Sequence, residues 1–97
     1  MGEAKKLENI VLVGKKPIMT YVSSIMMLFM NYDEVVIKAR GKSISFAVDI
    51  AEIVTKRFLK DVKVKDIKIG SDEFQGKDGS IRRASTMEIV LARKPIE

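Results

Sequence analysis

The feature that most limits the fold of this chain is a strand–helix–strand pattern near its start. Ile10–Val13 is a short, continuous apolar run without alternation, which is typical of a strand buried on both faces. Pro17 suits the first position of a helix, and apolar residues then recur at helical spacing as far as Asn31. Val35–Ala39 is rich in β-branched residues and therefore predicts a second strand, parallel to the first through a right-handed crossover.

A second helix follows, and after it the apolar positions change parity. Apolar residues recur on one helical face across Ser43–Phe58. Beyond this helix they occupy even positions at Val62 and Val64 but odd positions at Ile67 and Ile69. Because strand side chains alternate with a period of two, the change indicates a bulge or a strand that starts late, and we expect the late start.

The last third of the chain predicts a hairpin that projects from the body. Ile67–Phe74 and Ile81–Ala92 are strand-like, and the turn pair Asp78-Gly79 lies between them. The segments next to the turn, Ser71–Gln75 and Ser80–Ala84, are too polar for a core, so five residues per strand give an arm roughly 15 Å long. The predicted fold is an α/β (α+β two-layer) sandwich in the order βαβαββ, with a four-stranded mixed sheet, two helices and a projecting hairpin arm.

Composition limits both the partners and the chemistry. The 97 residues contain 18 Lys and Arg against 13 Asp and Glu, and this net charge of +5 suits a polyanionic partner such as nucleic acid or an anionic membrane, between which charge alone does not choose. The chain has no Cys and no His, and its best-spaced carboxylates, Asp49 and Glu52, fit an exposed helix flank beside Lys56, so we expect no enzyme, no metal and no cofactor. We expect residues 1–8 to form a flexible tail without the apolar core of a signal peptide. Residues 9–94 are expected to form one soluble, intracellular domain that does not bind membranes. A domain of this size gains stability by dimerising, so we expect a dimer.

Two strand-to-helix joints carry the same chemistry, Gly14-Lys15-Lys16-Pro17 and Arg40-Gly41-Lys42-Ser43. Either joint alone is simplest to interpret as a solvated turn, with Gly41 serving the backbone and Ser43 capping the helix. Parallel strands joined by a crossover end at the same sheet edge, so the joints are expected to bring four cations together: Lys15, Lys16, Arg40 and Lys42. The free N–H groups at a helix start also favour an anion, and the pair of joints therefore predicts a phosphate-binding surface.

The hairpin is the second candidate for contact with nucleic acid. Arg82 and Arg83, with Lys77 at the turn, predict a basic arm that reaches into or along a DNA groove. The lysines around the start of the third strand are expected to be only a solvated face: Lys63, Lys65 and Lys68.

The first helix holds two ambiguous features. Tyr21 lies about one turn beyond Pro17, where its hydroxyl either meets a phosphate or its ring packs in the core. The methionine-rich run Ile25–Met30 is expected to be buried core, because the helix must cover a sheet, rather than a membrane-binding or methionine-rich binding surface.

Three ordered motifs carry a resemblance to a known family. Gly14–Pro17 with Met19–Val22, Ile37–Ser45 with Ala47–Asp49, and Arg83–Ile89 closely resemble the Alba family of archaeal chromatin proteins, and the likeness extends from Asn9 to Lys94. Phe46 departs from the family pattern, in which a lysine is common at this position.

The resemblance implies a homodimer that coats and compacts double-stranded DNA without strong sequence preference, also binds RNA, and is found in the cytoplasm on the nucleoid. It implies that Lys15 is the lysine acetylated by a lysine acetyltransferase and restored by a sirtuin-type deacetylase, with Lys16 as its DNA-contacting neighbour. By the same resemblance Phe58 corresponds to the aromatic residue that makes contacts between dimers, which allows higher assemblies on DNA.

A second interpretation assigns the chain to RNA. Relatives of this fold occur in ribonuclease P-like particles, so the chain is alternatively an RNA-binding subunit or RNA chaperone of such an RNA-processing particle. It would then recognise A-form shape and 2′-hydroxyl groups.

Overall fold

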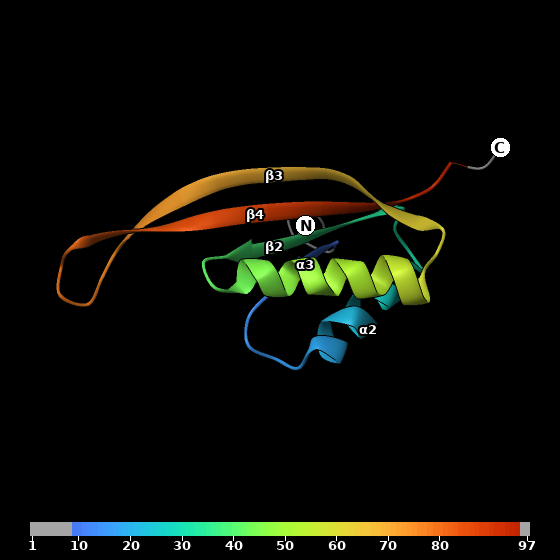
Figure 1. Cartoon of the computed structure of the whole chain (residues 1–97), viewed down its shortest axis with the longest axis horizontal. Coiled ribbons are helices and arrows are strands. Elements are labelled where there is room, and N and C mark those ends of the chain that lie inside the picture. The colour runs from blue at the N-terminus through green and yellow to red at the C-terminus, as the bar shows by residue number, and fades with distance from the viewer. Residues whose placement is uncertain (1–8, 96–97) are drawn as a thin grey trace, which may run out of the picture.

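The structure, a computed structural model, describes residues 9–95, so the predicted tail at residues 1–8 lies outside the described residues. The elements follow the order βαβαββ (Figure 1): β1 (Ile10–Leu12), α2 (Ile18–Leu28), β2 (Glu34–Arg40), α3 (Ser43–Ile53) with its π-helical extension η1 (Val54–Phe58), β3 (Val62–Gln75) and β4 (Ile81–Arg93). The predicted fold class, two helices and a four-stranded mixed sheet, is confirmed. No helix in the described part of the chain is long and apolar enough to cross a membrane.

The sheet has the strand order β1-β2-β4-β3. β1 pairs with β2 in parallel, and β4 pairs with both β2 and β3 in antiparallel. Both helices lie against the same face of the sheet, so the molecule has two layers and the other face of the sheet is left without a helix (Figure 1). The helix-facing side is set by the register, which aligns Val11 with Ile37 and Ile37 with Ile89.

The core lies between the helices and this one face. Seven aliphatic side chains from both layers are completely buried: Val22, Ile25, Val35, Ile37, Ile50, Val54 and Leu91. Each stabilises the fold by about 1.5–3 kcal/mol relative to an exposed side chain. The helices and the central strands are therefore held by ordinary apolar packing.

The expectation that the first strand is buried on both faces is wrong. Val11 is buried, but Leu12 is 71% exposed, and the strand ends one residue before Val13. The physical reason is that helices cover only one face of the sheet, while β1 is also an edge strand with a single partner. A continuous apolar run does not distinguish this arrangement from a strand covered on both sides.

The expected late start of the third strand is also wrong, and the structure has the bulge instead. β3 begins at Val62, whose side chain is almost completely buried, and its register on β4 shifts between Val64 and Asp66. Lys65 is the extra residue, and its ammonium pairs with the carboxylate of Glu34. The extra residue explains the change of parity while the strand stays paired on both sides of the bulge.

The methionine-rich run of the first helix is only partly core. Ile25 and Phe29, four residues apart, are buried, whereas Met27 and Met30 are exposed. An α-helix that covers one face of a sheet buries only a stripe of its side chains, so the residues between successive stripe positions remain in solvent. The ends of this helix also differ slightly from expectation, because Pro17 is the N-cap and Ile18 the first helical residue.

The turn from β2 into α3 depends on Gly41. Its φ is +59°, its N–H donates to the carbonyl of Ser85 at 2.8 Å, and its own carbonyl accepts from the N–H of Ile44 at 3.1 Å. Glycine alone adopts this left-handed backbone without a steric cost from Cβ.

We predict that Gly41→Ala lowers the free energy of unfolding by about 1 kcal/mol, since the added Cβ meets no atom within 4 Å and acts only through the backbone strain. Urea unfolding followed by circular dichroism measures the loss. Gly14→Ala is the matched control, because Gly14 has no positive φ and its Cβ would make an ordinary contact of 3.4 Å with the Tyr21 hydroxyl. Equal stability of the Gly41→Ala variant and the parent protein would contradict this account.

Candidate nucleic-acid interface

The two basic joints lie at the same end of the molecule, as their spacing predicts. The parallel register of β1 on β2 and the hydrogen bond from Val13 N–H to the Lys38 carbonyl bring both strands to one edge of the sheet. The loop from β1 to α2 and the turn from β2 to α3 both leave from this edge, next to the base of the β3–β4 arm (Figure 1). Lys15, Lys16, Arg40 and Lys42 are all exposed there.

The first joint is braced by Tyr21 from inside. The tyrosine is 6% exposed and belongs to the core, where the Phe46 ring meets it edge-on at 5.8 Å. Its hydroxyl oxygen accepts hydrogen bonds from Gly14 N–H at 2.8 Å and Lys16 N–H at 3.1 Å. The ring thus packs in the core while the oxygen fixes the loop that presents Lys15 and Lys16.

The helix starts at this end have no capping side chain. Pro17 caps α2 and Lys42 caps α3, neither with a side-chain hydrogen bond, and neither first turn contains an acidic residue. Ser43 is the first residue of α3 rather than its cap. Thr20 N–H donates to the Pro17 carbonyl at 3.0 Å and Ile44 N–H to the Gly41 carbonyl at 3.1 Å. The remaining backbone N–H groups of both first turns are suited to an anion, which complements the neighbouring cations.

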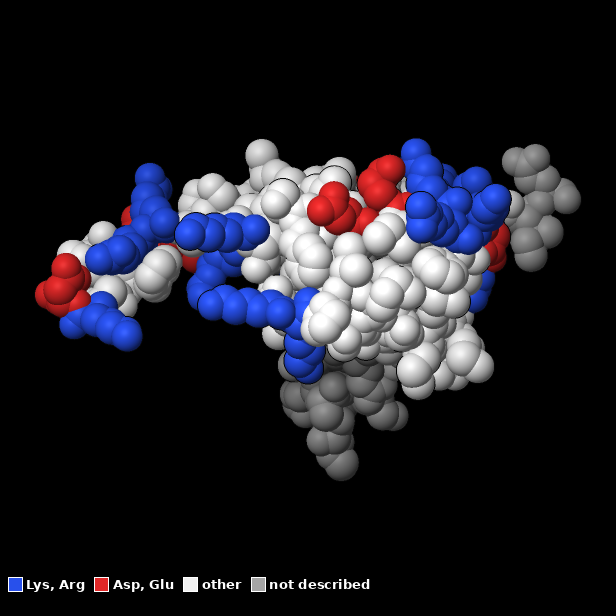
Figure 2. All heavy atoms as spheres, turned by 60° about the horizontal axis from the view of Figure 1, so that its bottom comes forward, with Lys and Arg blue, Asp and Glu red and all other residues white. Residues whose placement is uncertain are grey.

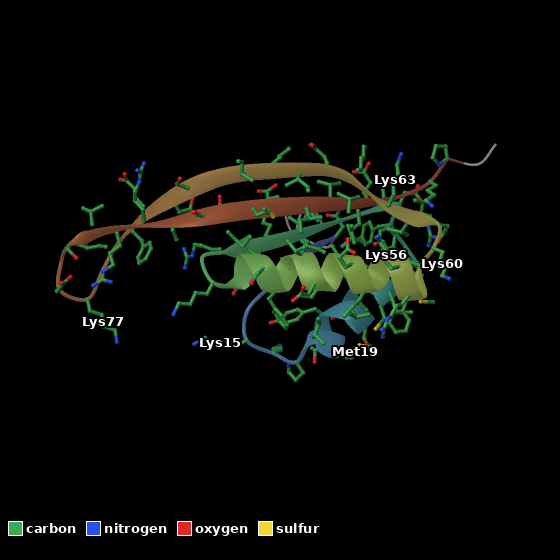
Figure 3. The ribbon with its side chains drawn as sticks, in the orientation of Figure 1. Lys15, Met19, Lys56, Lys60, Lys63 and Lys77 are labelled. Carbon is green, nitrogen blue, oxygen red and sulfur yellow. The ribbon has the colours of Figure 1, made fainter. Side chains whose placement is uncertain are left out.

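The hairpin arm projects as predicted. β2 stops pairing with β4 at Thr86, and the five register pairs from Ser71↔Ser85 to Gln75↔Ile81 join only β3 and β4. Lys77 lies at the tip of the arm (Figure 3). The tip is held by Asp78, whose carboxylate accepts from the Ser80 hydroxyl at 2.7 Å and the Ser80 N–H at 3.1 Å. Both bonds lower the pKa of the Asp78 carboxyl, and the bond from the Ser80 hydroxyl has the larger effect, so the carboxylate stays ionised near neutral pH.

The arm contains an aromatic residue that the sequence analysis did not select, one register pair from the turn. Phe74 lies under the guanidinium of Arg40, whose central carbon is 5.3 Å from the ring centroid. This cation–π contact joins the second basic joint to the arm. A large apolar residue inside an otherwise polar strand segment was the signal that could have identified it.

The cations of this interface are mostly without acidic partners. In residues 9–95, only Arg83 is paired, with Glu73 at 3.7 Å, and no ion pair involves the other six: Lys15, Lys16, Arg40, Lys42, Lys77 and Arg82. In Figure 2 the Lys and Arg atoms run along the arm and onto the adjoining end of the body. Like charges gathered in this way create a positive field that attracts a polyanion.

A second group of cations lies at the opposite end of the body, where Lys56, Lys60 and Lys63 are labelled in Figure 3. Acidic side chains are interspersed here, since Glu52 pairs with Lys56 at 3.5 Å and Asp61 pairs with Arg93 at 2.6 Å. Phe58, the last residue of η1, lies at this end and is 44% exposed. The structure therefore separates Phe58 from the basic joints and the arm.

Comparisons with known proteins agree with one another. The family model described as Alba matches residues 9–71. The "DNA/RNA-binding protein Alba" of Methanococcus maripaludis is 51% identical over 88% of this chain and 98% of its own length, and "DNA/RNA-binding protein Alba 1" of Archaeoglobus fulgidus is 52% identical over 90% and 98%.

Solved structures show the same fold. Alba from Thermoplasma volcanium superposes with a TM-score of 0.83 at 44% identity, covering 88% of this chain and all of the other. ALBA1 from Trypanosoma brucei, 24% identical with a TM-score of 0.66 over 90% of this chain and 71% of its own, shares the fold. The family match over more than half of the chain and the nearly full-length relatives above half identity lead to one conclusion: this chain belongs to the Alba family.

Proposed function

We propose that this protein is a dimeric, non-sequence-specific DNA-binding chromatin protein that coats and compacts duplex DNA at the nucleoid in the cytoplasm, and that it also binds RNA. The observation that carries the proposal is the group of exposed cations at the two joints and on the arm, of which only Arg83 has an ion-pair partner within residues 9–95. The printed names of the two relatives, DNA/RNA-binding proteins, support the same class of ligand.

Binding is divided between the joints and the arm. At the joints, Lys15, Lys16, Arg40 and Lys42 neutralise backbone phosphates beside the two uncapped helix starts. On the arm, Lys77, Arg82 and Arg83 follow a groove, where arginine suits a narrow minor groove. Phosphate contacts carry no sequence information, so the protein coats DNA of any sequence, and no cofactor takes part.

Lys15→Gln tests this mode of binding directly. Removing one phosphate contact weakens binding to all duplex sequences and lowers the slope of log K against log salt by about one unit. Salt titrations with matched DNA duplex, RNA duplex and single strands measure both quantities. Lys60→Gln is the matched control, because Lys60 is exposed at the opposite end and its loss leaves the slope unchanged.

An unchanged slope for Lys15→Gln would remove Lys15 from the interface. A clear preference of the parent protein for structured RNA over duplex DNA would instead favour the RNA-processing role.

Acetylation of Lys15 tunes this affinity. The lysine is exposed on a loop whose backbone is fixed by Tyr21, and it has no acidic partner within residues 9–95. Acetylation removes its charge without disturbing an existing ion pair. A lysine acetyltransferase and a sirtuin-type deacetylase are the implied enzymes.

Dimerisation covers an apolar strip on β3. Ile67 and Ile69 pair with Ile89 and Met87, so they lie on the helix-facing side of the sheet, yet both are exposed. Val48 on α3 is exposed as well. A second copy of the chain with the same strip would bury these side chains in an interface related by twofold symmetry.

Ile69→Lys is expected to destabilise the dimer by about 2 kcal/mol, the loss typical of a central interface residue. Sedimentation equilibrium detects the shift toward monomer. Leu12→Lys is the matched control, because Leu12 is 71% exposed but lies on the opposite face of the sheet from Ile69, which is 79% exposed. Equal dissociation constants for the Ile69→Lys variant and the parent would place the interface elsewhere.

Phe58 joins neighbouring dimers along DNA. Its ring is partly exposed, and the next residue, Leu59, lines an apolar hollow with Met26, Met27, Phe29 and Met30. Packing of dimer against dimer at this end leaves the basic joints and the arm free for DNA, and it provides a route to compaction.

Phe58→Ala is therefore expected to keep the fold and single-site DNA affinity but to reduce cooperativity, with a loss of about 2 kcal/mol per contact between dimers. Binding isotherms on long duplexes and thermal melting are measured on the same variant. A strongly lowered melting temperature with unaltered cooperativity would show that Phe58 serves only the core of its own subunit.

A further inference from the structure

Phe74 is an aromatic residue outside the hydrophobic core. It lies on the part of β3 that pairs only with β4, and its side chain is 40% exposed. Its register partner is Arg82, and both lie on the side of the sheet that faces away from the helices, together with Arg40. Phe74 does not belong to the core cluster, so packing of the hydrophobic core does not account for an aromatic residue at this position.

The ring is fixed on one side by Arg40. The guanidinium lies over the ring at 5.3 Å from its centroid, and it extends from the end of β2, which belongs to the rigid sheet. This contact orders the phenyl group before any ligand arrives, so stacking on it costs little conformational entropy.

A hollow of about 440 Å³ lies beyond the ring, toward the tip of the arm. Its lining combines the aromatic ring, two cations, turn residues and the Asp78 carboxylate, which is bonded to Ser80: Phe74, Gln75, Gly76, Lys77, Asp78 and Arg82. Gly76 provides the room for Arg82, because a Cβ at this position would lie 2.7 Å from the arginine Nε. The volume is within the range of roughly 300–1,000 Å³ that is usual for small-ligand sites.

We propose that this hollow is a stacking site for one unpaired nucleobase, which lies against Phe74 while Arg82 and Lys77 bind the phosphates beside it. The proposal rests on the nucleic-acid binding proposed above and deepens it by assigning single-stranded segments to the arm. Bases in an intact duplex are already stacked on both faces, so the site selects single strands or loops of RNA or DNA. Every base offers a π-face, and the site has no sequence preference.

Phe74→Leu tests the stacking contact while keeping an apolar side chain and all charges. The probes are a single-stranded RNA and a single-stranded DNA of the same sequence, each containing 2-aminopurine, and a DNA duplex without the label. We expect the parent protein to quench 2-aminopurine, and Phe74→Leu to lose the quenching and about five- to tenfold of single-strand affinity while duplex affinity and the salt slope stay unchanged. Phe74→Tyr restores both signals because it restores the aromatic face.

Ile81→Ala is the matched control. Ile81 is an exposed apolar residue of the same arm, but it pairs with Gln75 and lies on the opposite side from Phe74. We expect it to leave quenching and affinity unchanged, and thermal melting confirms that all variants are folded.

Each outcome decides between the alternatives. If Phe74→Leu loses affinity for both single strands, the nucleobase itself is the ligand. If it loses affinity for the RNA strand alone, the site is specific for RNA. An equal loss on the duplex would overturn the proposal in favour of a wedge between paired bases or a general effect on the arm, and unchanged single-strand binding would overturn it outright. If the parent binds the duplex but does not quench 2-aminopurine in the single strands, only this inference fails. If the parent binds no nucleic acid, the proposed function fails.

Discussion

The antiparallel ladder between β2 and β4 is the interaction on which the rest of the molecule depends. Its helix-facing side chains, Ile37, Ile89 and Leu91 among them, form the floor of the core. The same β4 continues past Thr86 into the arm, so the direction of the arm is set by the sheet and not by a separate hinge. β2 ends beside it at Arg40, which places the second basic joint at the root of the arm. The fold and the proposed binding surface therefore share one pair of strands.

Charge is distributed unevenly over this frame. On the body, cations are partly balanced, as in the pairs of Lys38 with Glu88 and Lys56 with Glu52. At the joints and on the arm, only Arg83 is in an ion pair among the described residues, although the arm also carries Asp72 and Asp78. Exposed ion pairs contribute little to stability, so the absence of partners at the binding end costs the fold little while it leaves a strong positive field there.

Local sequence patterns predicted the order of the elements, the proximity of the two joints and the number of residues in the arm. Each of these depends on the periodicity of apolar residues and on polar turn residues between the elements. They did not show which faces are covered. Leu12 is exposed because the helices cover only one face of the sheet, and Met30 is exposed because the first helix buries only one stripe of side chains. Both facts depend on how the elements assemble. The parity change at Lys65 was visible, but the choice of a bulge depends on the burial of Val62 and on Glu34, which lies far away in the sequence. Phe74 was missed because its partner Arg40 is equally distant along the chain.

The two-stranded end of the hairpin has a consequence for how such a protein can change over evolutionary time. A ribbon of two strands without a hydrophobic core is at best marginally stable alone, so its amides are expected to exchange with solvent independently of the body. Substitutions or insertions at the tip therefore leave the free energy of global unfolding almost untouched. The contacts that we propose for the arm can therefore change by mutation while the packing of the body stays the same.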